Sequence, residues 1–476
     1  MLADIIIPQN ISEIGVSAFE NCSSLPGIIL PSKITNISNN TFAGCVKLDN
    51  IIIHKDITSI GANAFAGCTG LTFVEFESAV PPTIQSTSFD SCDNLKITIP
   101  TGEASLKAYL ASCWNDATLL KIPYLLDPAN LPAGYWIEYT TTDDQPVQFK
   151  NINPFYTCYL NGKCVALSRS LITSFGGFVS GRERILTCTL PESVSVIAEF
   201  AFDTCSNLKN VNIPINVSRI EKYTFRDCGL TDVIIPENIR YLGEGAFIRC
   251  SNLVNLEIKP GLEVIGFGAF QYCSALTTLT LPNTVKRIGE DYGAVFLGCD
   301  RLTSITLPEN LIDLGDETFT SCSNLKDIVL PNSLSKIGHR VFLGCSSLSN
   351  INIPDGVTEI GEYAFGGCSS LSNINFPEGV ESIGECVLEY CYNIQRITFP
   401  STLNTLGKHI FGDHSYNTHS VIIYCNALIP PTLSGELISG YNAGSNKVYI
   451  KVPSAALNDY KQDALWKKYS LRAIEL

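Results

Sequence analysis

The sequence repeats itself about every 23 residues, and this repeat constrains the fold more than any other feature. Residues 346–368 read SSLSNINIPDGVTEIGEYAFGGC, and residues 369–391 read SSLSNINFPEGVESIGECVLEYC. In the first unit Ile351 and Ile353 alternate with polar residues, which is typical of a short half-buried strand, and Pro354 then removes a backbone donor and ends it. One unit has too few apolar residues to form a core alone, whereas stacked units bury one another, so the repeat predicts a solenoid.

Two columns of equivalent residues, a phenylalanine and a cysteine three positions after it, set the register of the coils. Three units depart from this pattern. Leu388 takes the place of phenylalanine before Cys391, and two weaker units, at 172–178 and 406–411, lack the cysteine. The columns predict a β-rich solenoid of the leucine-rich-repeat type, a right-handed coil of about fifteen turns in two arrays with helical C-terminal caps. Gly361 is expected to supply a backbone conformation that other residues avoid. Phenylalanine stands three residues before cysteine at 19/22, 42/45, 65/68, 89/92, 202/205, 225/228, 247/250, 270/273, 296/299, 319/322, 342/345 and 365/368.

The chain has 19 cysteines, and thirteen of them occupy the same position of the repeat. We interpret these thirteen as small apolar side chains of the core. Their side chains should all point the same way from stacked coils, which is poor geometry for a disulfide, so we expect free thiols. The pattern makes no prediction for the redox state of Cys113, Cys158, Cys164, Cys386 and Cys425.

Two stretches of the chain show the same succession of features, a strand, a proline and then a helix, which indicates two C-terminal caps. After a distorted coil at 79–89, Pro100 precedes Leu106, Tyr109, Leu110 and Cys113 at helical spacing. Near the other end, ALIPPTLSGELISG precedes YIKVPSAALNDYKQDALWKKY, where Pro453 opens a helix that carries Leu457, Tyr460 and Ala464, with Trp466 nearby. Terminal repeats need such covers. We therefore expect a first array with its cap at 1–122, a connector and N-terminal hairpin cap at 123–170, a second array at 171–425, and a C-terminal cap at 426–476.

Residues 123–170 do not follow the repeat. Residues 136–149, WIEYTTTDDQPVQF, alternate as a hairpin would, with TDDQ at the turn. The sequence TCYLNGKCVAL contains Asn161-Gly162, the strongest short hairpin signal, which would pair Tyr159 with Cys164 and Cys158 with Val165. Cys158 and Cys164 would then face opposite sides of the ribbon, so we expect no bond between them.

Charge and hydropathy exclude some partners. The net charge is −14 and there is no basic cluster, which argues against nucleic acid or an anionic bilayer. No transmembrane run of 18 or more apolar residues and no signal peptide occurs. Because Ile5-Ile6-Ile7-Pro8 already forms a repeat strand, we expect the natural protein to extend further toward the N-terminus.

Chemistry-bearing motifs are scarce. Three of the five histidines, His409, His414 and His419, lie five residues apart, which places them on no common face of a helix or strand. No Gly-rich phosphate loop, GxSxG elbow or HExxH helix occurs. A nucleophilic cysteine needs an exposed thiolate beside a base, and the repeat cysteines are expected in the core. We therefore assign no catalytic, cofactor-binding or metal-ligating residue, no cofactor, and no enzymatic activity.

Binding is the better-supported hypothesis, and it falls on the strand positions that should face outward. These positions form a polar, weakly charged ribbon on which Phe73 is the one aromatic residue, and Arg396 the one residue of the kind that anchors protein interfaces. Two interpretations stay open, since small polar residues simply suit an exposed strand and also suit a wide binding surface. The candidate binding face consists of Asn255, Glu257, Thr278, Thr280, Asn350, Asn352, Asn373, Asn375, Arg396 and Thr398.

The unit I-x-I-P-x-x-V-x-x-I-G-x-x-A-F-x-G-C-x-x-L resembles the BspA-type leucine-rich repeat of bacterial surface proteins, over about three quarters of the chain. The flanking segments, WIEYTTTDD with NGKCVAL and the proline-helix-Tyr-Trp ending, resemble the flanks of such arrays in gut Bacteroides-type proteins. The resemblance implies a secreted or outer-surface protein, often lipid-anchored, here through a missing N-terminal segment. It also implies adhesion to host proteins or to other cells, without catalytic residues.

Three functions follow as hypotheses. The first is an extracellular interaction scaffold, expected to be a monomer, that adheres to host or microbial surface proteins through the sheet face. The second is a surface glycan-binding module, which the scarcity of aromatic residues on the ribbon disfavours. The third is a passive spacer that holds another domain.

Overall fold

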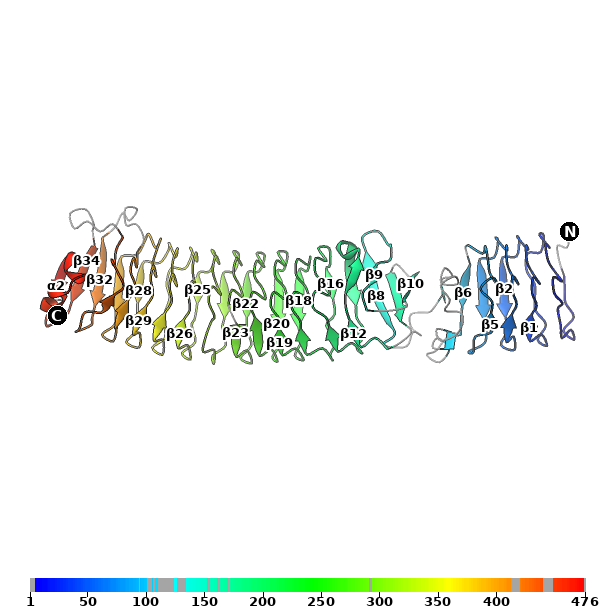
Figure 1. Ribbon diagram of the computed structural model, residues 1–476, viewed down its shortest axis with the longest axis horizontal. Coiled ribbons are helices and arrows are strands. Elements are labelled where there is room, and N and C mark those ends of the chain that lie inside the picture. The colour runs from blue at the N-terminus through cyan, green and yellow to red at the C-terminus, as the bar shows by residue number, and fades with distance from the viewer. Residues whose placement is uncertain are drawn as a thin grey trace. The chain divides into compact units, whose positions relative to one another are not determined.

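A computed structural model shows a β-solenoid whose coils stack through short parallel strands (Figure 1). Contacts within the chain divide it into two compact units. Unit 1 comprises residues 1–146, 151–173 and 188–194, and unit 2 comprises residues 147–150, 174–187 and 195–476. The structure describes residues 5–93, 95–100, 105, 108–109, 124–125, 134–151, 155–160, 163–168, 171–290, 293–411, 420–439 and 448–474.

One side of the coils carries the longer strands, which we call the long-strand ladder. In β2 and β18 isoleucines or valines alternate between core and solvent, as the period of two predicts. In unit 1 it consists of β2 (Asn50–Ile53), β4 (Phe73–Phe76), β6 (Lys96–Thr98) and β7 (Tyr124–Leu125), all parallel. In unit 2 it consists of β18 (Asp232–Ile235), β20 (Asn255–Ile258), β22 (Thr278–Thr280), β24 (Ser304–Thr306), β25 (Asp327–Ile328), β28 (Asn373–Asn375), β30 (Arg396–Phe399), β32 (Val421–Cys425), β34 (Val448–Val452) and β35 (Leu471–Ala473).

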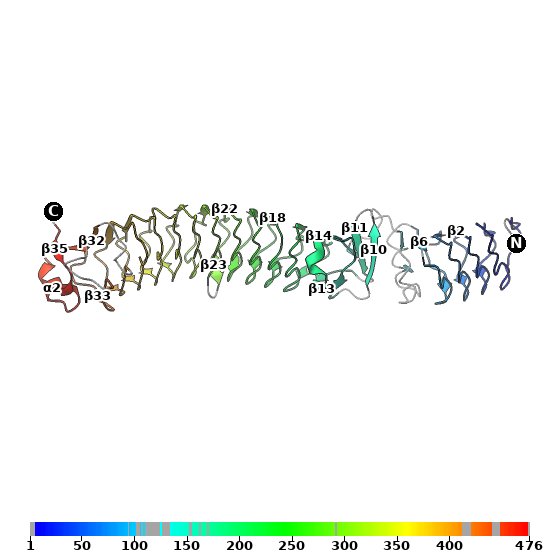
Figure 2. The same cartoon turned by 90° about the horizontal axis from the view of Figure 1, so that it is seen from above.

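A second side carries strands of mostly two residues, the short-strand ladder, again parallel and stacked coil on coil (Figure 2). In unit 1 it consists of β1 (Asn36–Ile37), β3 (Ser59–Ile60) and β5 (Thr83–Ile84). In unit 2 it consists of β12 (Ser174–Phe175), β15 (Val196–Ile197), β17 (Arg219–Ile220), β19 (Tyr241–Leu242), β21 (Val264–Gly266), β23 (Arg287–Glu290), β26 (Lys336–Ile337), β27 (Glu359–Ile360), β29 (Ser382–Ile383), β31 (Thr405–Leu406) and β33 (Thr432–Leu433).

The third side of each coil is a series of tight turns that also hydrogen-bonds to the next coil. Most of these turns contain two residues with positive φ, one two positions before the phenylalanine and one directly before the cysteine, as at Arg340 (54°) and Gly344 (77°). The turns bring alternate amides toward the next coil, so Phe342 N donates to Ala364 O at 2.8 Å and Gly344 N to Gly366 O at 2.7 Å. The coils are therefore joined by backbone hydrogen bonds on all three sides.

Gly361, which lies just before the turn of its coil, has a different role from the expected one. Gly361 does not have positive φ; instead, a Cβ at this position would lie 2.5 Å from the carbonyl carbon of Gly338 in the preceding coil. Gly384 and Gly407 are equally close to the coil before them. The expectation of a special backbone conformation at Gly361 was wrong, because close approach of stacked backbones, and not φ, excludes a side chain here.

Phenylalanine and cysteine form two continuous columns in the core, as predicted. Phe342 and Cys345 are fully buried, and neighbouring phenylalanine rings stack nearly parallel. Ring centroids are 5.1–5.4 Å apart from Phe19 to Phe89 in unit 1 and 5.1–5.8 Å apart from Phe202 to Phe365 in unit 2. At the start of unit 2, Phe149 packs on Phe175 and so covers the first ring of the column.

The two hairpin predictions had different outcomes. β10 (Phe155–Leu160) and β11 (Lys163–Ser168) pair antiparallel with Cys158 opposite Val165 and Tyr159 opposite Cys164, which confirms the register set by Asn161-Gly162. The side chain of Cys158 lies outside the described residues. The hairpin expected at 136–149 was wrong, because β8 (Trp136–Thr141) pairs with β11 and β9 (Gln148–Phe149) pairs with β13 (Phe178–Ser180).

The turn expected inside 136–149 nevertheless forms, with Thr141 Oγ1 donating to Gln145 O. After this turn, Pro146 has no backbone N–H to donate to β8. Phe149 packs instead against the rings of Phe175 and Phe178. The strands β14 (Ile185–Thr189) and β16 (Asn210–Val211) and the short helix η3 (Arg182–Arg184) belong to the coils that precede β18.

Both cap stretches place a tyrosine in the same way. Tyr109 is buried and donates its hydroxyl to Ser78 O at 3.0 Å, and Tyr460 is buried and donates to Ala427 O at 3.0 Å. Each carbonyl belongs to the residue three positions before a Pro-Pro-Thr sequence. Each cap also ends in a parallel strand pair, β6 with β7 and β34 with β35. The two cap stretches therefore resemble each other in the hydrogen bond of their tyrosine as well as in sequence.

The C-terminal helix is shorter than its pattern suggests. α2 (Leu457–Gln462) ends before Ala464, and the 3₁₀ helix η5 (Trp466–Lys468) follows. Asp463 lies between them, and its Oδ1 accepts the amide of Trp466, the first residue of the 3₁₀ helix, at 3.0 Å. Leu106, Leu110 and Cys113 of the first cap lie outside the described residues. In the part of the chain described above, no helix combines the length and apolar composition that crossing a bilayer requires.

Candidate functional site

The outward side chains of the long-strand ladder in unit 2 form the candidate site, which we call the long-strand face. All ten residues predicted for it lie where expected: nine are exposed and Thr398 is partly exposed. Asn373 pairs in register with Arg396, and Asn375 with Thr398. Asn350 and Asn352 lie in a coil without an assigned strand, yet they too alternate with buried isoleucines.

Within this face, three of the ten residues form hydrogen bonds or ion pairs along the surface. Asn255 Nδ2 donates to Asp232 Oδ1 at 2.6 Å on the neighbouring strand, and Lys259 pairs with Glu257. Asn373 Nδ2 donates to Ser372 Oγ at 3.0 Å. Because an amide has two donors and an acceptor, each asparagine keeps capacity for a partner after one such bond. The face can therefore offer many adaptable hydrogen bonds over several coils.

The long-strand face continues beyond the residues that the sequence predicted. Strands β32 and β34 extend the ladder from β30 with register pairs Thr398–Tyr424 and Tyr424–Lys451, and β35 adds Arg472 beside Lys451. Sequence reasoning assigned this region to the edge of the second array and its cap and so ended the ribbon at Thr398. In VIIYC and VYIKV, core residues alternate with outward ones, and this pattern could have extended the predicted ribbon to these strands.

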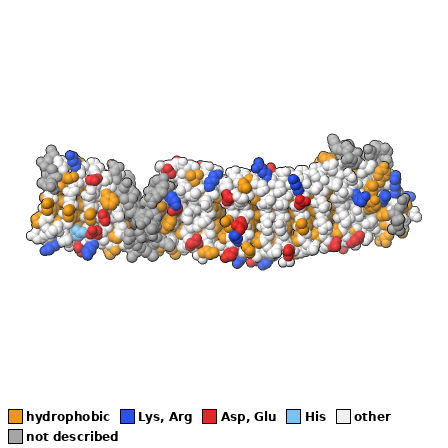
Figure 3. Space-filling model, turned by 180° about the vertical axis from the view of Figure 1, so that it is seen from behind, with side chains coloured by type: hydrophobic (Ala, Val, Ile, Leu, Met, Phe, Trp, Pro, Cys, Tyr) orange, Lys and Arg blue, Asp and Glu red, His pale blue; other side chains and the backbone are white. Residues whose placement is uncertain are grey.

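These added strands bring aromatic and basic side chains together. The guanidinium carbon of Arg396 lies 5.8 Å from the ring centroid of Tyr424, and Lys451 Nζ lies 5.4 Å from the same centroid. The guanidinium carbon of Arg472 lies 4.7 Å from the ring centroid of Tyr449. We call these five residues the tyrosine–cation cluster. Figure 3 shows basic side chains gathered near the C-terminal end of unit 2.

Burial suppresses the reactivity of the cysteines inside the column. Burial raises the pKa of the Cys68, Cys250 and Cys299 thiols to about 12, and it raises the pKa of Cys345 further. The thiols stay protonated at neutral pH, and the thiolate is the reactive form. Each donates instead to a carbonyl of the preceding coil, as Cys345 Sγ does to Phe319 O at 3.2 Å.

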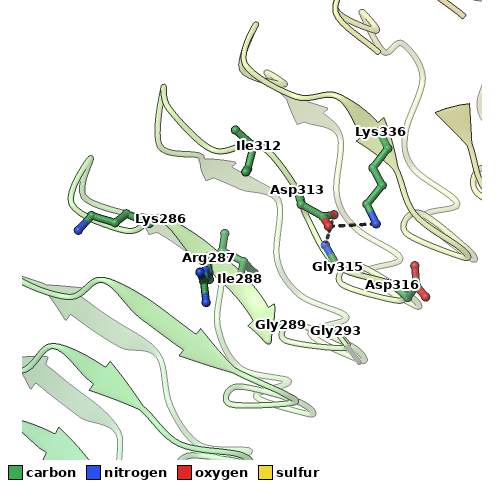
Figure 4. A pocket seen from close by; sticks show the side chains of 10 residues that line it. All are labelled: Lys286, Arg287, Ile288, Gly289, Gly293, Ile312, Asp313, Gly315, Asp316 and Lys336. Carbon is green, nitrogen blue, oxygen red and sulfur yellow. Dashed lines mark hydrogen bonds and ion pairs between the residues drawn. The ribbon is translucent and has the colours of Figure 1, made fainter. Parts of the chain in front are cut away.

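A cleft of about 320 Å³ lies beside the short-strand ladder of unit 2 (Figure 4). It follows the three extra residues in IGEDYGAVF, which are flanked by Gly289 and Gly293, both with positive φ. After this insertion the coil at 310–315 has no short strand, so the ladder is interrupted between β23 and β26. Inside the cleft Asp313 accepts the amide of Gly315 at 2.9 Å and pairs with Lys336 at 3.1 Å.

Two of the cations that line this cleft are paired with carboxylates: Lys336 pairs with Asp313, and Lys286 pairs with Glu263. The residues around the cleft are Lys286, Arg287, Ile288, Gly289, Gly293, Ile312, Asp313, Gly315, Asp316 and Lys336.

The three described histidines, His54, His339 and His409, belong to no cluster of possible metal ligands. His54 Nε2 lies 3.0 Å from Pro31 O, and His339 Nδ1 accepts the amide of Glu362 at 3.3 Å. His409 is described, whereas His414 and His419 lie outside the described residues. Among the residues described, no group of three or more His, Cys, Asp or Glu side chains could hold a metal ion.

Unit 1 carries an apolar strip on its own outward strand positions. Ile6, Ile29 and Ile52 are exposed by 88%, 80% and 51%, and they line a hollow of about 550 Å³. Such a strip was not predicted, because the sequence analysis treated outward positions as polar. Nothing in the structure shows what covers it.

The comparisons with known proteins agree with this architecture. The family model described as BspA type Leucine rich repeat region matches residues 1–114, 178–293 and 292–418, in six copies. No match exists among curated protein sequences.

Solved structures similar to this chain include a leucine-rich repeat protein from Bacteroides ovatus, with 22% identity over 68% of this chain and 91% of that one, at a TM-score of 0.37. The pneumococcal vaccine antigen PcpA has 19% identity over 67% of this chain and 88% of that one, at a TM-score of 0.42. A leucine rich cell surface protein from Faecalibacterium prausnitzii has 20% identity over 76% of this chain and 82% of that one, at a TM-score of 0.31.

Proposed function

Because the chain belongs to the BspA-type leucine-rich-repeat family, we propose that it is an interaction scaffold at the cell surface or outside the cell. In this proposal the long-strand face of unit 2 binds host proteins or the surface proteins of other microbes. Proteins built from such repeats generally act as binding scaffolds, since stacked coils create an extended surface.

The observation that carries the proposal is the exposure of the ten predicted residues on one ladder of strands. Asn350, Asn352, Asn373 and Asn375 are all exposed, and the buried residues between them hold their backbone in a regular array. A partner protein can bind such a surface through hydrogen bonds around a few anchoring residues.

The proposal includes no catalytic activity. Burial and raised pKa values keep the column thiols in their unreactive protonated form, as at Cys250 and Cys299. Several described carboxylates on the surface pair with basic side chains of adjacent coils, as Glu263 does with Lys286 and Glu317 with Arg340. These arrangements support a binding surface.

A four-residue variant of the face tests the proposal. Replacing Asn350, Asn352, Asn373 and Asn375 by lysine adds four positive charges without touching the core. We expect binding to extracellular-matrix, serum or cell-surface protein preparations to fall at least about tenfold, which corresponds to about 1.4 kcal/mol. Binding would be measured by pull-down and by biolayer interferometry on the fractions that the wild-type chain captures.

The matched control places four lysines at exposed, uncharged positions of the short-strand side, at Ser335, Thr358, Asn404 and Thr405, so both variants gain four positive charges. This variant should bind as the wild type does. Equal loss in both variants, unchanged binding in the face variant, or no binding by the wild-type chain to any preparation would each contradict the proposal.

A further inference from the structure

We propose that the tyrosine–cation cluster at the C-terminal end of the long-strand face is the docking anchor for an acidic segment of a partner protein. The inference deepens the proposed function and rests on it. It concerns Arg396, Tyr424, Tyr449, Lys451 and Arg472, of which only Arg396 was predicted from the sequence.

The first argument is that these three cations lack the carboxylate partners that comparable cations have. Arg219, Lys222, Arg226 and Arg340 also lie over aromatic rings, and each of them also pairs with an aspartate or glutamate. Within the described residues, Arg396, Lys451 and Arg472 form no ion pair with a carboxylate. Three unneutralised positive charges thus share one end of a chain whose net charge is −14.

The second argument is that the rings hold the cations in place. Tyr424 has two cations near its ring, Arg396 from β30 and Lys451 from β34. A cation over a ring is attracted by the negative charge of the ring face and keeps its N–H donors available. Arginine in such a position can present its donors in pairs to a carboxylate. The cluster is therefore ordered before an anion arrives, which lowers the entropic cost of binding.

The third argument distinguishes a protein partner from a sugar. Cations lie near the faces of the tyrosine rings, so these faces are not open platforms for stacking a sugar ring. Tyrosine and arginine together are instead the composition that dominates energetic hot spots of protein interfaces. Complementary charge then favours an acidic partner over a neutral or basic one.

The geometry suits an extended segment. The cations lie on β30, β34 and β35, which span three steps between parallel strands at about 4.8 Å each. In an extended chain, side chains on one face recur about every 6.6–6.8 Å, so two or three acidic residues at alternate positions can each reach a cation.

The experiment uses the full chain and fluorescein-labelled poly-L-glutamate as the probe, with binding measured by fluorescence anisotropy. The cluster variant is Arg396→Gln, Lys451→Gln and Arg472→Gln. The control variant is Lys222→Gln, Lys286→Gln and Arg340→Gln, which removes three paired cations and changes the net charge equally. We expect the wild type and the control to bind alike, and the cluster variant to bind at least about tenfold more weakly. Affinity of the wild type should fall as salt rises.

A second pair of variants tests the rings. Tyr424→Phe keeps the ring and should bind the probe within about twofold of the wild type, whereas Tyr424→Leu removes it and should weaken binding several-fold. Circular dichroism would verify that all variants fold. Equal effects of Phe and Leu would overturn the role given to the ring.

Three results would overturn the inference itself: no binding of poly-L-glutamate, equal weakening in the cluster and control variants, or tighter binding of heparin than of poly-L-glutamate through the same three cations. The last result would assign the cluster to a sulfated polysaccharide. These outcomes are separable from failure of the proposed function, because the asparagine variants of that test share no residue with the cluster variant.

Discussion

At the scale of single residues, the cysteine of each coil combines two properties that other small residues have separately. Its side chain is apolar enough to lie fully buried beside the phenylalanine column, and its thiol donates a hydrogen bond. The carbonyl of Phe319 accepts both the amide of Cys322 in its own coil, at 3.0 Å, and the thiol of Cys345 in the next, at 3.2 Å. Alanine would lose this donor, and serine would bury a more polar group.

The thiol contacts recur with donor–acceptor distances of 3.1–3.3 Å in both units. They are donated by Cys45, Cys68, Cys92, Cys228, Cys250, Cys273, Cys299, Cys322, Cys345, Cys368 and Cys391.

Burial predicts which thiols react. A thiolate reacts with Ellman's reagent by attacking its disulfide, and Cys345 is fully buried with a raised pKa, whereas Cys22 is partly exposed. In the native protein at pH 8, we expect Cys345→Ala to leave the number of fast-reacting thiols unchanged and Cys22→Ala to lower it by one. Loss of a fast-reacting thiol in Cys345→Ala would contradict the buried column.

At the scale of elements, the close stacking of coils depends on positions where no side chain fits. The backbone at Gly361 approaches that of Gly338 so closely that a Cβ would meet its carbonyl carbon at 2.5 Å. Gly15 has the same place in its repeat, and a Cβ there would meet nothing within 4 Å. Gly15 lies in the first coil of this sequence, so no preceding coil packs against it here, and it serves as the control for a glycine that does meet such a coil.

This difference gives a matched pair of substitutions. We expect Gly361→Ala to lower the free energy of unfolding by about 1–3 kcal/mol, since the two backbones must separate. Gly15→Ala should leave it unchanged or raise it by up to about 1 kcal/mol, because alanine restricts the unfolded chain. Urea unfolding followed by circular dichroism measures both, and hydrogen exchange localises the effect. Equal costs for the two substitutions would refute the stacking argument.

At the scale of the whole molecule, stability is the sum of many similar interfaces between neighbouring coils. A small effect on stability that recurs in many coils therefore adds up to a large effect on the whole chain. The raised pKa of the column thiols is such a property, because burial acts in the same direction at Cys68, Cys250, Cys299 and Cys391, each with a pKa of about 12 against an ordinary value of 9.0.

The pH dependence follows from this linkage. Below pH 9 the thiols are protonated in both states and add no dependence on pH. Between pH 9 and about 12 the unfolded chain releases protons that the folded chain keeps, so the free energy of unfolding falls by about 1.4 kcal/mol per pH unit for each such thiol. We expect the urea midpoint to decline steeply above pH 9.

A double variant, Cys250→Ala with Cys299→Ala, separates thiols from the lysines and tyrosines that titrate in the same range. It should start from a lower midpoint at pH 8 and decline less steeply above pH 9 than the wild type. The same slope in both proteins would show that the column thiols are not the source of the dependence.

Much of the fold could be predicted from the sequence because the repeat encodes it locally. The spacing of Phe342 and Cys345 placed both in the core, and the alternation around Ile351 and Ile353 placed the outward asparagines. The register of β10 with β11 followed from the two-residue turn at Asn161-Gly162. Each of these signals lies within one repeat or one turn, where period and turn chemistry decide the outcome.

The parts that could not be predicted depend on contacts between coils or on strands outside the repeat. The role of Gly361 is set by the backbone of Gly338, which is 23 residues away. The pairing of β9 with β13 depends on where Phe149 can bury its ring. The tyrosine–cation cluster exists because β32 and β34 join the ladder although their spacing differs from that of the repeat.

By itself, then, the sequence determined that this chain coils, which residues each coil buries, and which it turns toward solvent, because an alternating strand and a recurring turn are decided within about 23 residues. Only the tertiary structure decided how closely the coils approach, which carbonyls the thiols bond, and which cations share one surface. Those features arise from atoms that are distant in the chain and adjacent in space, and no local pattern records their distances.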